Sequence, residues 1–189
     1  MTRATRPDLL VLGAGLAGLF AAIRAAELGA RVTLVTKGAL RASTSFHAQG
    51  GVAAALGAGD SPTLHRRDTL AAGAALCDAA AVEVLVEEGP ARVRELQTAG
   101  AEFDLDPSGQ LKLGREAAHS TNRIVHAHGD QTGAEVARTL IERVRASTRI
   151  RVLERARVLE LVVTRGAAAG ALGFAGSKPG PGDEVIFAV

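Results

Sequence analysis

Gly13-Ala14-Gly15-Leu16-Ala17-Gly18 spells a complete G-x-G-x-x-G, and the fold expected for this chain depends on it. Gly13 permits a tight turn, Gly15 lets a pyrophosphate approach the backbone, and Gly18 allows a helix to pack closely on a strand. The first N–H groups of that helix then face the phosphates. The motif therefore predicts a dinucleotide-binding turn, with a plain strand-to-helix turn as the alternative.

The flanks of the motif supply the structural context that it needs. The apolar run 8–12 predicts a buried parallel strand, and the Ala-rich run 15–29 predicts a helix that Gly29 ends. Residues 31–35 predict a second strand because three of the five are β-branched. Together these pieces form a βαβ unit, which predicts an α/β, Rossmann-like domain with a parallel central sheet and crossover helices.

The end of the second strand argues against NAD. An acid that holds the adenosine ribose is expected there, but the sequence has Thr36-Lys37. Three interpretations of Lys37 stay open: contact with a 2′-phosphate, a rearranged ribose site, or a solvated surface lysine.

Downstream of the βαβ unit, caps, turns and periodicity predict the remaining elements. Ser61 before Pro62 and Asp78 each predict a helix start, and Gly89-Pro90 predicts an interruption of the second of these helices. Asp106-Pro107-Ser108-Gly109 predicts the turn of a small hairpin. The expected elements are a short helix beginning in 52–56, helices at 62–72, 78–99 and 132–146, hairpin arms at 101–105 and 110–113, strands at 150–153, 157–163 and 171–174, a Gly/Pro turn at 176–182, and a last strand from 184.

Composition excludes several classes of protein. With 189 residues and 47% hydrophobic content the chain can bury a core, whereas a net charge of +2 and 3% aromatic residues argue against a nucleic-acid platform. The single cysteine, Cys77, rules out an intrachain disulfide and suits a reducing compartment. No apolar run is long enough for a membrane span and no secretory signal is visible, so we expect a cytoplasmic protein that binds neither membrane nor nucleic acid.

A hydroxyl-rich loop follows the βαβ unit and reads Ser43-Thr44-Ser45-Phe46-His47-Ala48-Gln49-Gly50-Gly51. Its hydroxyl groups, its amide and its two glycines offer hydrogen bonds and close backbone approach to a flat, phosphorylated ligand.

The glycine motif and this loop together resemble the succinate dehydrogenase/fumarate reductase flavoprotein family, and most closely the branch that oxidises L-aspartate to iminoaspartate for NAD synthesis. The stretches that carry the resemblance are 8–19, 44–54, 68–78, 115–120 continuing through 124–126, and 129–133. These cover most of the chain.

The resemblance implies that the cofactor is FAD. Thr44 stands where covalently flavinylated members have a histidine, which implies that FAD is bound without a covalent link. The motif and the resemblance together give the predicted cofactor-binding residues: Gly13, Ala14, Gly15, Leu16, Ala17, Gly18, Lys37, Thr44, Ser45, Phe46, His47, Ala48, Gln49, Gly50 and Gly51.

The resemblance also implies that Glu116 lies beside the substrate and orients aspartate through its ammonium group, with His119 as its neighbour. The alternative for Glu116 is a surface ion pair with Arg115 or Arg123. Ala117-Ala118 replaces the Gly-Gly pair that is common in the family. The added methyl groups are expected either to fill space beside the flavin or to strain a position with positive φ.

The activity that the resemblance implies is FAD-dependent oxidation of L-aspartate, with oxygen or fumarate as electron acceptor and quinolinate synthase as pathway partner. Two alternatives stay open: a succinate/fumarate-type flavoprotein, and a non-catalytic FAD-binding fragment. We expect residues 1–189 to form the N-terminal portion of an FAD-binding domain that is incomplete at its C-terminal end. We likewise expect the capping and C-terminal helical domains of the family to lie outside residues 1–189.

Other candidate sites carry less weight. His119, His126 and His128 match no closed zinc pattern, so no metal site is predicted. Cys77 precedes a helix cap, where a reactive thiol is conceivable, but a small buried side chain is the preferred interpretation.

Overall fold

The computed structural model describes residues 7–176 and 184–188, and the chain divides into two compact units. The first unit comprises residues 1–46 and 140–189, and the second comprises residues 47–139. Within the described residues, no helix combines the length and the apolar character needed to cross a membrane.

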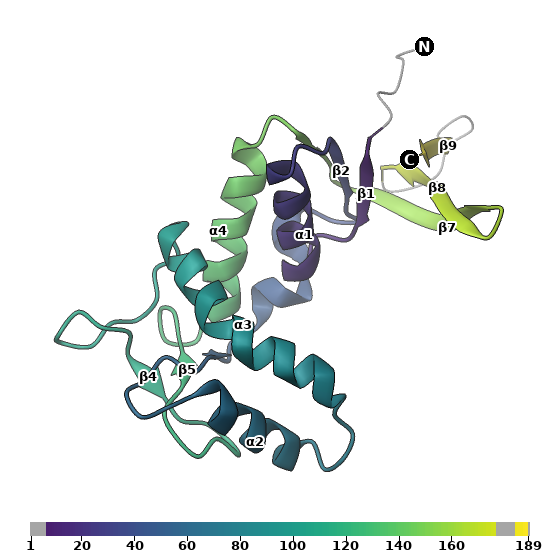
Figure 1. The fold of residues 1–189 in the computed structure, drawn as a ribbon. Coiled ribbons are helices and arrows are strands. Elements are labelled where there is room, and N and C mark those ends of the chain that lie inside the picture. Colours follow the sequence, from purple (N-terminus) through teal and green to yellow (C-terminus); the bar gives the residue numbers. More distant parts are fainter. Residues whose placement is uncertain (1–6, 177–183, 189) are drawn as a thin grey trace. The chain divides into compact units, whose positions relative to one another are not determined.

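The first unit is built on a parallel sheet with the strand order β1-β2-β6, formed by Leu9–Leu12, Val32–Val35 and Ile150–Leu153 (Figure 1). The central strand β2 is buried along its whole length, as a parallel strand with two neighbours should be. Helix α1 (Leu16–Glu27) connects β1 to β2 and buries an apolar stripe of Leu19, Ala22, Ile23 and Ala26. The predicted βαβ unit and parallel sheet are confirmed.

Two single-turn 3₁₀ helices, η1 (Leu40–Ala42) and η2 (Thr44–His47), occupy the loop after β2. An antiparallel meander follows β6 and consists of β7 (Ala156–Thr164), β8 (Ala167–Ala175) and β9 (Glu184–Ala188). The three strands were predicted, although β8 begins four residues before its predicted start at residue 171. The predicted turn at 176–182 lies outside the described residues except for Gly176, which has a φ of +108°.

The second unit holds an antiparallel sheet with the order β3-β5-β4, formed by Val52–Ala53, Ile124–Val125 and Leu113–Gly114. Two helices, α2 (Pro62–Ala72) and α3 (Ala79–Thr98), pack together beside it. The predicted caps are confirmed: the Ser61 hydroxyl accepts from the Leu64 N–H, and the Asp78 carboxylate accepts from the Ala80 and Ala81 N–H groups. Helix α4 (Thr132–Ala146) has the predicted bounds and spans the boundary between the units.

Three predicted details are wrong. Residues 52–53 form strand β3 and not the start of a helix, because a five-residue run cannot nucleate a helix against pairing with the buried β5. Helix α3 continues through Pro90, where the preceding Gly89 has no side chain to meet the proline ring. The hairpin turn forms, with the Asp106 N–H donating to the Gln110 carbonyl, but its arms share only the bridge Leu105–Leu111, because Leu113 pairs with β5 instead.

Candidate functional site

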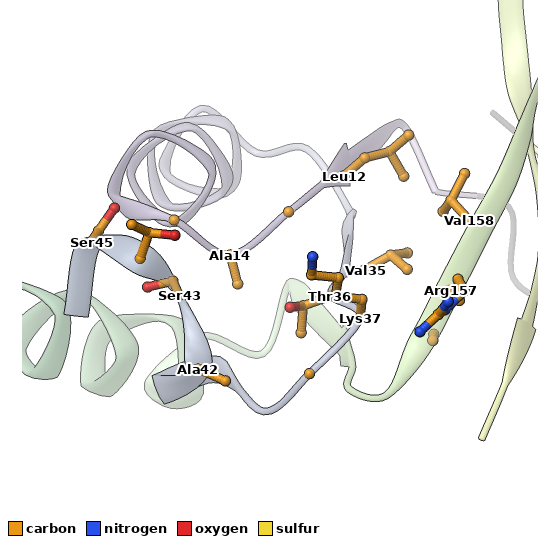
Figure 2. A pocket seen from close by; sticks show the side chains of 15 residues that line it. Leu12, Ala14, Val35, Thr36, Lys37, Ala42, Ser43, Ser45, Arg157 and Val158 are labelled. Atoms are coloured by element: carbon orange, nitrogen blue, oxygen red, sulfur yellow. The ribbon is translucent and has the colours of Figure 1, made fainter. Parts of the chain in front are cut away.

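A cavity of about 740 Å³ opens in the first unit at the carboxyl ends of β1 and β2 (Figure 2). This edge is where open parallel sheets bind ligands, and the volume lies in the range of about 300–1,000 Å³ found for small-molecule sites. The lining comes from the glycine turn, the end of β2 with its following loop, and the beginning of β7: Leu12, Gly13, Ala14, Gly15, Val35, Thr36, Lys37, Gly38, Ala42, Ser43, Thr44, Ser45, Ala156, Arg157 and Val158.

The glycine turn has the geometry that the motif predicts. Gly13 has a φ of +106°, a conformation that side chains disfavour. A Cβ on Gly18 would lie 2.0 Å from the Gly13 carbonyl oxygen, so this glycine lets the helix approach the turn. Gly15 is the N-cap of α1 and is extended, and its own Cβ would meet only the Ser45 hydroxyl at 3.5 Å. Added atoms are therefore excluded at Gly18 and sterically tolerated at Gly15.

The charges around this turn fit the phosphates of FAD. The first turn of α1 contains no acidic residue, so the positive end of the helix faces the cavity without a competing anion. The Leu16 N–H makes a long hydrogen bond of 3.5 Å to the Ser45 hydroxyl, which an anion could replace. Lys37 and Arg157 add two cations to the lining, and neither makes an ion pair with another described residue. Figure 2 shows Ser45 beside the beginning of α1 and Arg157 on the opposite side of the cavity.

The structure brings part of the predicted cofactor set together in this cavity. Gly13, Ala14, Gly15, Lys37, Thr44 and Ser45 line it. Leu16, Ala17 and Gly18 continue into the first turn of α1, and Phe46 lies in η2, where its N–H donates to the Ser43 hydroxyl at 3.3 Å. Ala156, Arg157 and Val158 were missed, because no local signal shows that β7 begins beside the end of β2.

Residues 47–51, the rest of the predicted set, belong to the second unit. His47, Ala48, Gln49 and Gly50 are exposed, and the Gln49 amide donates to the Asp130 carboxylate at 3.3 Å. A Cβ on Gly51 would lie 2.2 Å from an Ile124 methyl carbon and 2.6 Å from the Val125 carbonyl oxygen, whereas one on Gly50 would meet nothing. Gly51 therefore serves close packing on β5. Gly50 alone of the pair has open space beside it.

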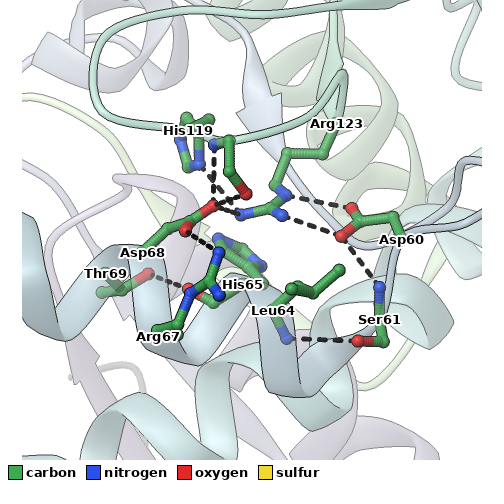
Figure 3. Close-up of polar contacts among 10 residues, drawn as sticks. Asp60, Ser61, Leu64, His65, Arg67, Asp68, Thr69, His119 and Arg123 are labelled. Atoms are coloured by element: carbon green, nitrogen blue, oxygen red, sulfur yellow. Dashed lines mark hydrogen bonds and ion pairs between the residues drawn. The ribbon is translucent and has the colours of Figure 1, made fainter.

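A cluster of buried charges lies in the second unit around Arg123 (Figure 3). Arg123 is fully buried and forms a two-pronged ion pair with Asp60, with Nε and Nη2 at 2.9 and 2.8 Å from the carboxylate oxygens. Its Nη1 donates to Asp68 Oδ2 at 2.9 Å. Hydrogen bonds from Ser120, assisted by Arg123, lower the pKa of Asp68 from 3.8 to about 2. Asp68 therefore stays ionised, and the buried cation has two anionic partners.

The predicted catalytic residues lie at the two ends of one tight turn. The His119 N–H donates to the Glu116 carbonyl at 3.2 Å, which closes the turn 116–119. Ala117 within it has a φ of +46°, so of the two expected effects of the alanine pair the structure supports backbone strain. The predicted alternative for Glu116, an ion pair with Arg115 or Arg123, is not found: its Oε1 accepts from His126 Nε2 at 2.9 Å.

The surroundings of His119 include groups that the sequence did not suggest. Its Nδ1 lies 3.2 Å from Arg123 Nη1, and its ring makes an edge contact with the buried His65, with ring centroids 5.5 Å apart. Burial and the charge of Arg123 lower the pKa of His65, which keeps that ring neutral. His65 Nδ1 is buried without a hydrogen-bond partner.

Two further candidates from the sequence were a metal site and the single cysteine. Across residues 7–176 and 184–188, no group of three or more His, Cys, Asp or Glu side chains is arranged to hold a metal ion. Cys77 is half-buried, and its Sγ lies 3.7 Å from the Thr69 carbonyl oxygen.

The comparison with protein families identifies the chain. A family model described as "FAD binding domain" matches residues 8–185. The chain belongs to this FAD-binding family. The predicted cofactor and the α/β fold class are therefore confirmed, while the individual contact residues stay predictions.

Relatives of this FAD-binding domain are L-aspartate oxidases. The sequence is 52% identical to that of Streptomyces coelicolor over 155 residues, which cover 82% of this chain and 27% of the relative. It is 44% identical to that of Agrobacterium fabrum over 182 residues, covering 95% of this chain and 34% of the relative. The chain thus spans about a quarter to a third of the curated relatives that it matches. The predicted resemblance to the branch of the family that oxidises L-aspartate is confirmed.

Solved structures with the same fold include an Sdh1 complex and a quinol fumarate reductase. The Sdh1 complex of Mycobacterium smegmatis matches with a TM-score of 0.85 and 36% identity, over 90% of this chain and 31% of the other. A quinol fumarate reductase of E. coli matches with a TM-score of 0.87 and 30% identity, over 90% of this chain and 29% of the other.

Proposed function

We propose that this protein provides the FAD-binding part of an L-aspartate oxidase, which converts L-aspartate to iminoaspartate and passes the electrons to oxygen or fumarate. The observation that carries the proposal is the 52% identity with an L-aspartate oxidase over 155 residues. Identity to the Sdh1 complex and to the quinol fumarate reductase is lower, at 36% and 30%.

The cavity of the first unit is the proposed place of the FAD phosphates. Gly13, Gly15 and the first N–H groups of α1 would contact them, and Lys37 and Arg157 would supply positive charge. Ser45 and Thr44 add hydroxyl groups, and the described residues that line the cavity include no histidine. We propose that FAD is held there without a covalent link. When bound, FAD supplies the acceptor for the two electrons that leave the substrate.

Glu116 is the proposed partner of the substrate ammonium group. Its Oε1 is held by His126, whereas its Oε2 has no partner among the described residues and is free to accept from an ammonium. A carboxylate held in this way can bind the ammonium group and fix the orientation of the amino acid. The ammonium group is present in the free substrate, so this contact is expected to affect mainly the binding of L-aspartate. A charge-assisted hydrogen bond of this kind contributes about 1.5–3 kcal/mol.

The other enzymatic candidate is a succinate/fumarate-type flavoprotein, which the TM-score of 0.87 with a fumarate reductase keeps in consideration. Succinate has no ammonium group, so Glu116 would have no partner in such an enzyme. A non-catalytic FAD-binding protein is the remaining alternative.

Turnover separates these candidates. We expect steady-state oxidation of L-aspartate by the FAD-loaded protein and none of succinate. Glu116→Gln should raise the KM for L-aspartate by about 10–100-fold, the equivalent of one charge-assisted hydrogen bond. Glu102→Gln is the matched control, since Glu102 is an exposed acid that also faces a histidine, His128, at 4.0 Å. Saturable FAD binding without turnover of either acid would favour the non-catalytic FAD-binding protein. Turnover of succinate alone would favour the succinate/fumarate-type flavoprotein.

The product suggests where the reaction belongs. Iminoaspartate is an imine and hydrolyses in water, so we propose that a second enzyme, quinolinate synthase in NAD synthesis, consumes it rapidly. We propose the cytoplasm as the location, although the Arabidopsis thaliana relative is named chloroplastic.

A further inference from the structure

We propose that Arg123 is a positioning residue that holds His119 as a neutral imidazole with its proton on Nε2, so that His119 acts as a hydrogen-bond donor and not as a base. The key contact is the 3.2 Å distance between Arg123 Nη1 and His119 Nδ1. A guanidinium can only donate, so Nδ1 must accept and must be unprotonated. The proton of the neutral ring then lies on Nε2.

Arg123 cannot turn away from this contact. Asp60 holds its Nε and Nη2, and Asp68 holds one hydrogen of Nη1, so the guanidinium plane is fixed by two buried carboxylates. The second hydrogen of Nη1 is the one that remains for His119 (Figure 3). A rigid planar donor of this kind selects one orientation of the imidazole ring.

The other charged and titratable groups near His119 do not compete for its Nδ1. Asp68 Oδ2 already accepts from the Ser120 N–H, the Ser120 hydroxyl and Arg123, and both oxygens of Asp60 are bonded to Arg123. The buried His65 contacts the ring of His119 edge-on and makes no hydrogen bond with it. Across the described residues, no carboxylate is bonded to His119, so nothing favours a proton on Nδ1.

The opposite nitrogen is the functional one. Nε2 of the half-buried ring has no hydrogen-bond partner among the described residues. An Nε2–H group can donate to an acceptor oxygen of a bound carboxylic acid, whereas a base would need a lone pair at that position. Which acid supplies the oxygen rests on the proposed function; the position of the proton does not.

The position of the proton can be measured in the wild-type protein without FAD or turnover. The chain has five histidines, so two-bond ¹H–¹⁵N correlation spectra of ¹⁵N-histidine-labelled protein resolve each ring, and His119→Gln assigns the signals of His119. We expect an unprotonated Nδ1 and a protonated Nε2 at neutral pH. A proton on Nδ1, on either form of the ring, would overturn the proposal.

Two substitutions at His119 distinguish a donor from a base. The amide of His119→Gln can still donate, so kcat/KM for L-aspartate should stay within about tenfold of wild type, while His119→Phe should lose about 10–100-fold with the hydrogen bond. If kcat/KM of His119→Gln falls as far as that of His119→Phe, by about 10²–10⁴-fold, His119 is a base and the proposal fails. Absence of any L-aspartate turnover by the wild type would count against the proposed function, and the nitrogen signals would still decide the proton position.

The role of Arg123 has its own control. In Arg123→Met the nitrogen signals of His119 should no longer show a proton on Nε2 alone. Arg92→Met, which removes an exposed arginine of α3, should leave these signals unchanged. A folded Arg123→Met protein that keeps a pure Nε2–H ring would contradict the positioning role. If this variant does not fold, the wild-type spectrum decides.

Discussion

The glycine turn of the first unit and the Arg123 cluster of the second differ in what they are made of. The turn is built from backbone atoms within six consecutive residues and has no acidic group in the adjacent helix turn. The cluster is built from charged side chains, and its carboxylates lie 63 and 55 positions from the arginine. The first is therefore sensitive to added atoms, and the second to removed charges.

This difference predicts where substitutions do most damage. The largest effect is expected for Arg123→Met, which leaves Asp60 and Asp68 buried without their cation. Breaking a buried ion pair from one side costs about 3–5 kcal/mol in the free energy of unfolding. Urea denaturation measures it, with the exposed Arg92→Met as the control that should change stability by about 0–1 kcal/mol. An equal loss in the free energy of unfolding for Arg123→Met and Arg92→Met would show that the buried cluster contributes no more than an exposed ion pair.

The turn is tested by adding one methyl group at two places. Gly18→Ala should lower the free energy of unfolding by about 1–3 kcal/mol, because its Cβ would meet a backbone carbonyl that cannot move aside. Gly15→Ala should leave stability nearly unchanged, since its Cβ finds ordinary contact with Ser45, yet it should weaken FAD binding by occupying the approach to the phosphates. Thermal unfolding and FAD titration separate the two effects. Equal destabilisation by both variants would show that the close approach at Gly18 is not the cause.

A change of pH compares a buried carboxylate with an exposed one. The pKa of Asp68 is lowered to about 2 from 3.8, so the stability it contributes is complete above pH 3.8 and is lost as the pH falls towards 2. Asp68→Asn should flatten the acid unfolding curve in that window at any salt concentration. The pKa of Asp8 is also lowered to about 2, through hydrogen bonds from Arg31, but this pair is exposed.

Asp8→Asn should therefore have a smaller effect, and salt should screen it. Acid titrations at low and high salt, followed by circular dichroism, test both variants. A strong salt dependence of the Asp68 contribution would contradict its burial.

The smallest effect concerns the strained turn. Ala117 has a φ of +46°, and a left-handed conformation costs a non-glycine residue about 1–2 kcal/mol. Ala117→Gly should therefore raise the melting temperature slightly, while Ala118→Gly, at a position without positive φ, should lower it or leave it unchanged. Destabilisation by Ala117→Gly would mean that the methyl group makes a contact that outweighs the strain.

The same contrast explains what the sequence could predict. The sequence predicts the roles of Gly13, Gly15 and Gly18 because all three belong to one local turn. It predicts the helix starts at Ser61 and Asp78 for the same reason, since a cap bonds only to the next few residues. Asp60, Asp68 and Arg123 carry no local signal, since only the fold brings them together. Residues 52–53 were misassigned because pairing with β5 outweighs the helix propensity of an Ala-rich run.

We propose above that this FAD-binding domain serves the oxidation of L-aspartate. The most direct measurement is the visible flavin absorbance of the FAD-loaded protein, followed without oxygen after mixing with L-aspartate or succinate. We predict that L-aspartate bleaches the flavin, that succinate does not, and that Glu116→Gln requires a higher concentration of L-aspartate. Bleaching by succinate and not by L-aspartate would contradict the account.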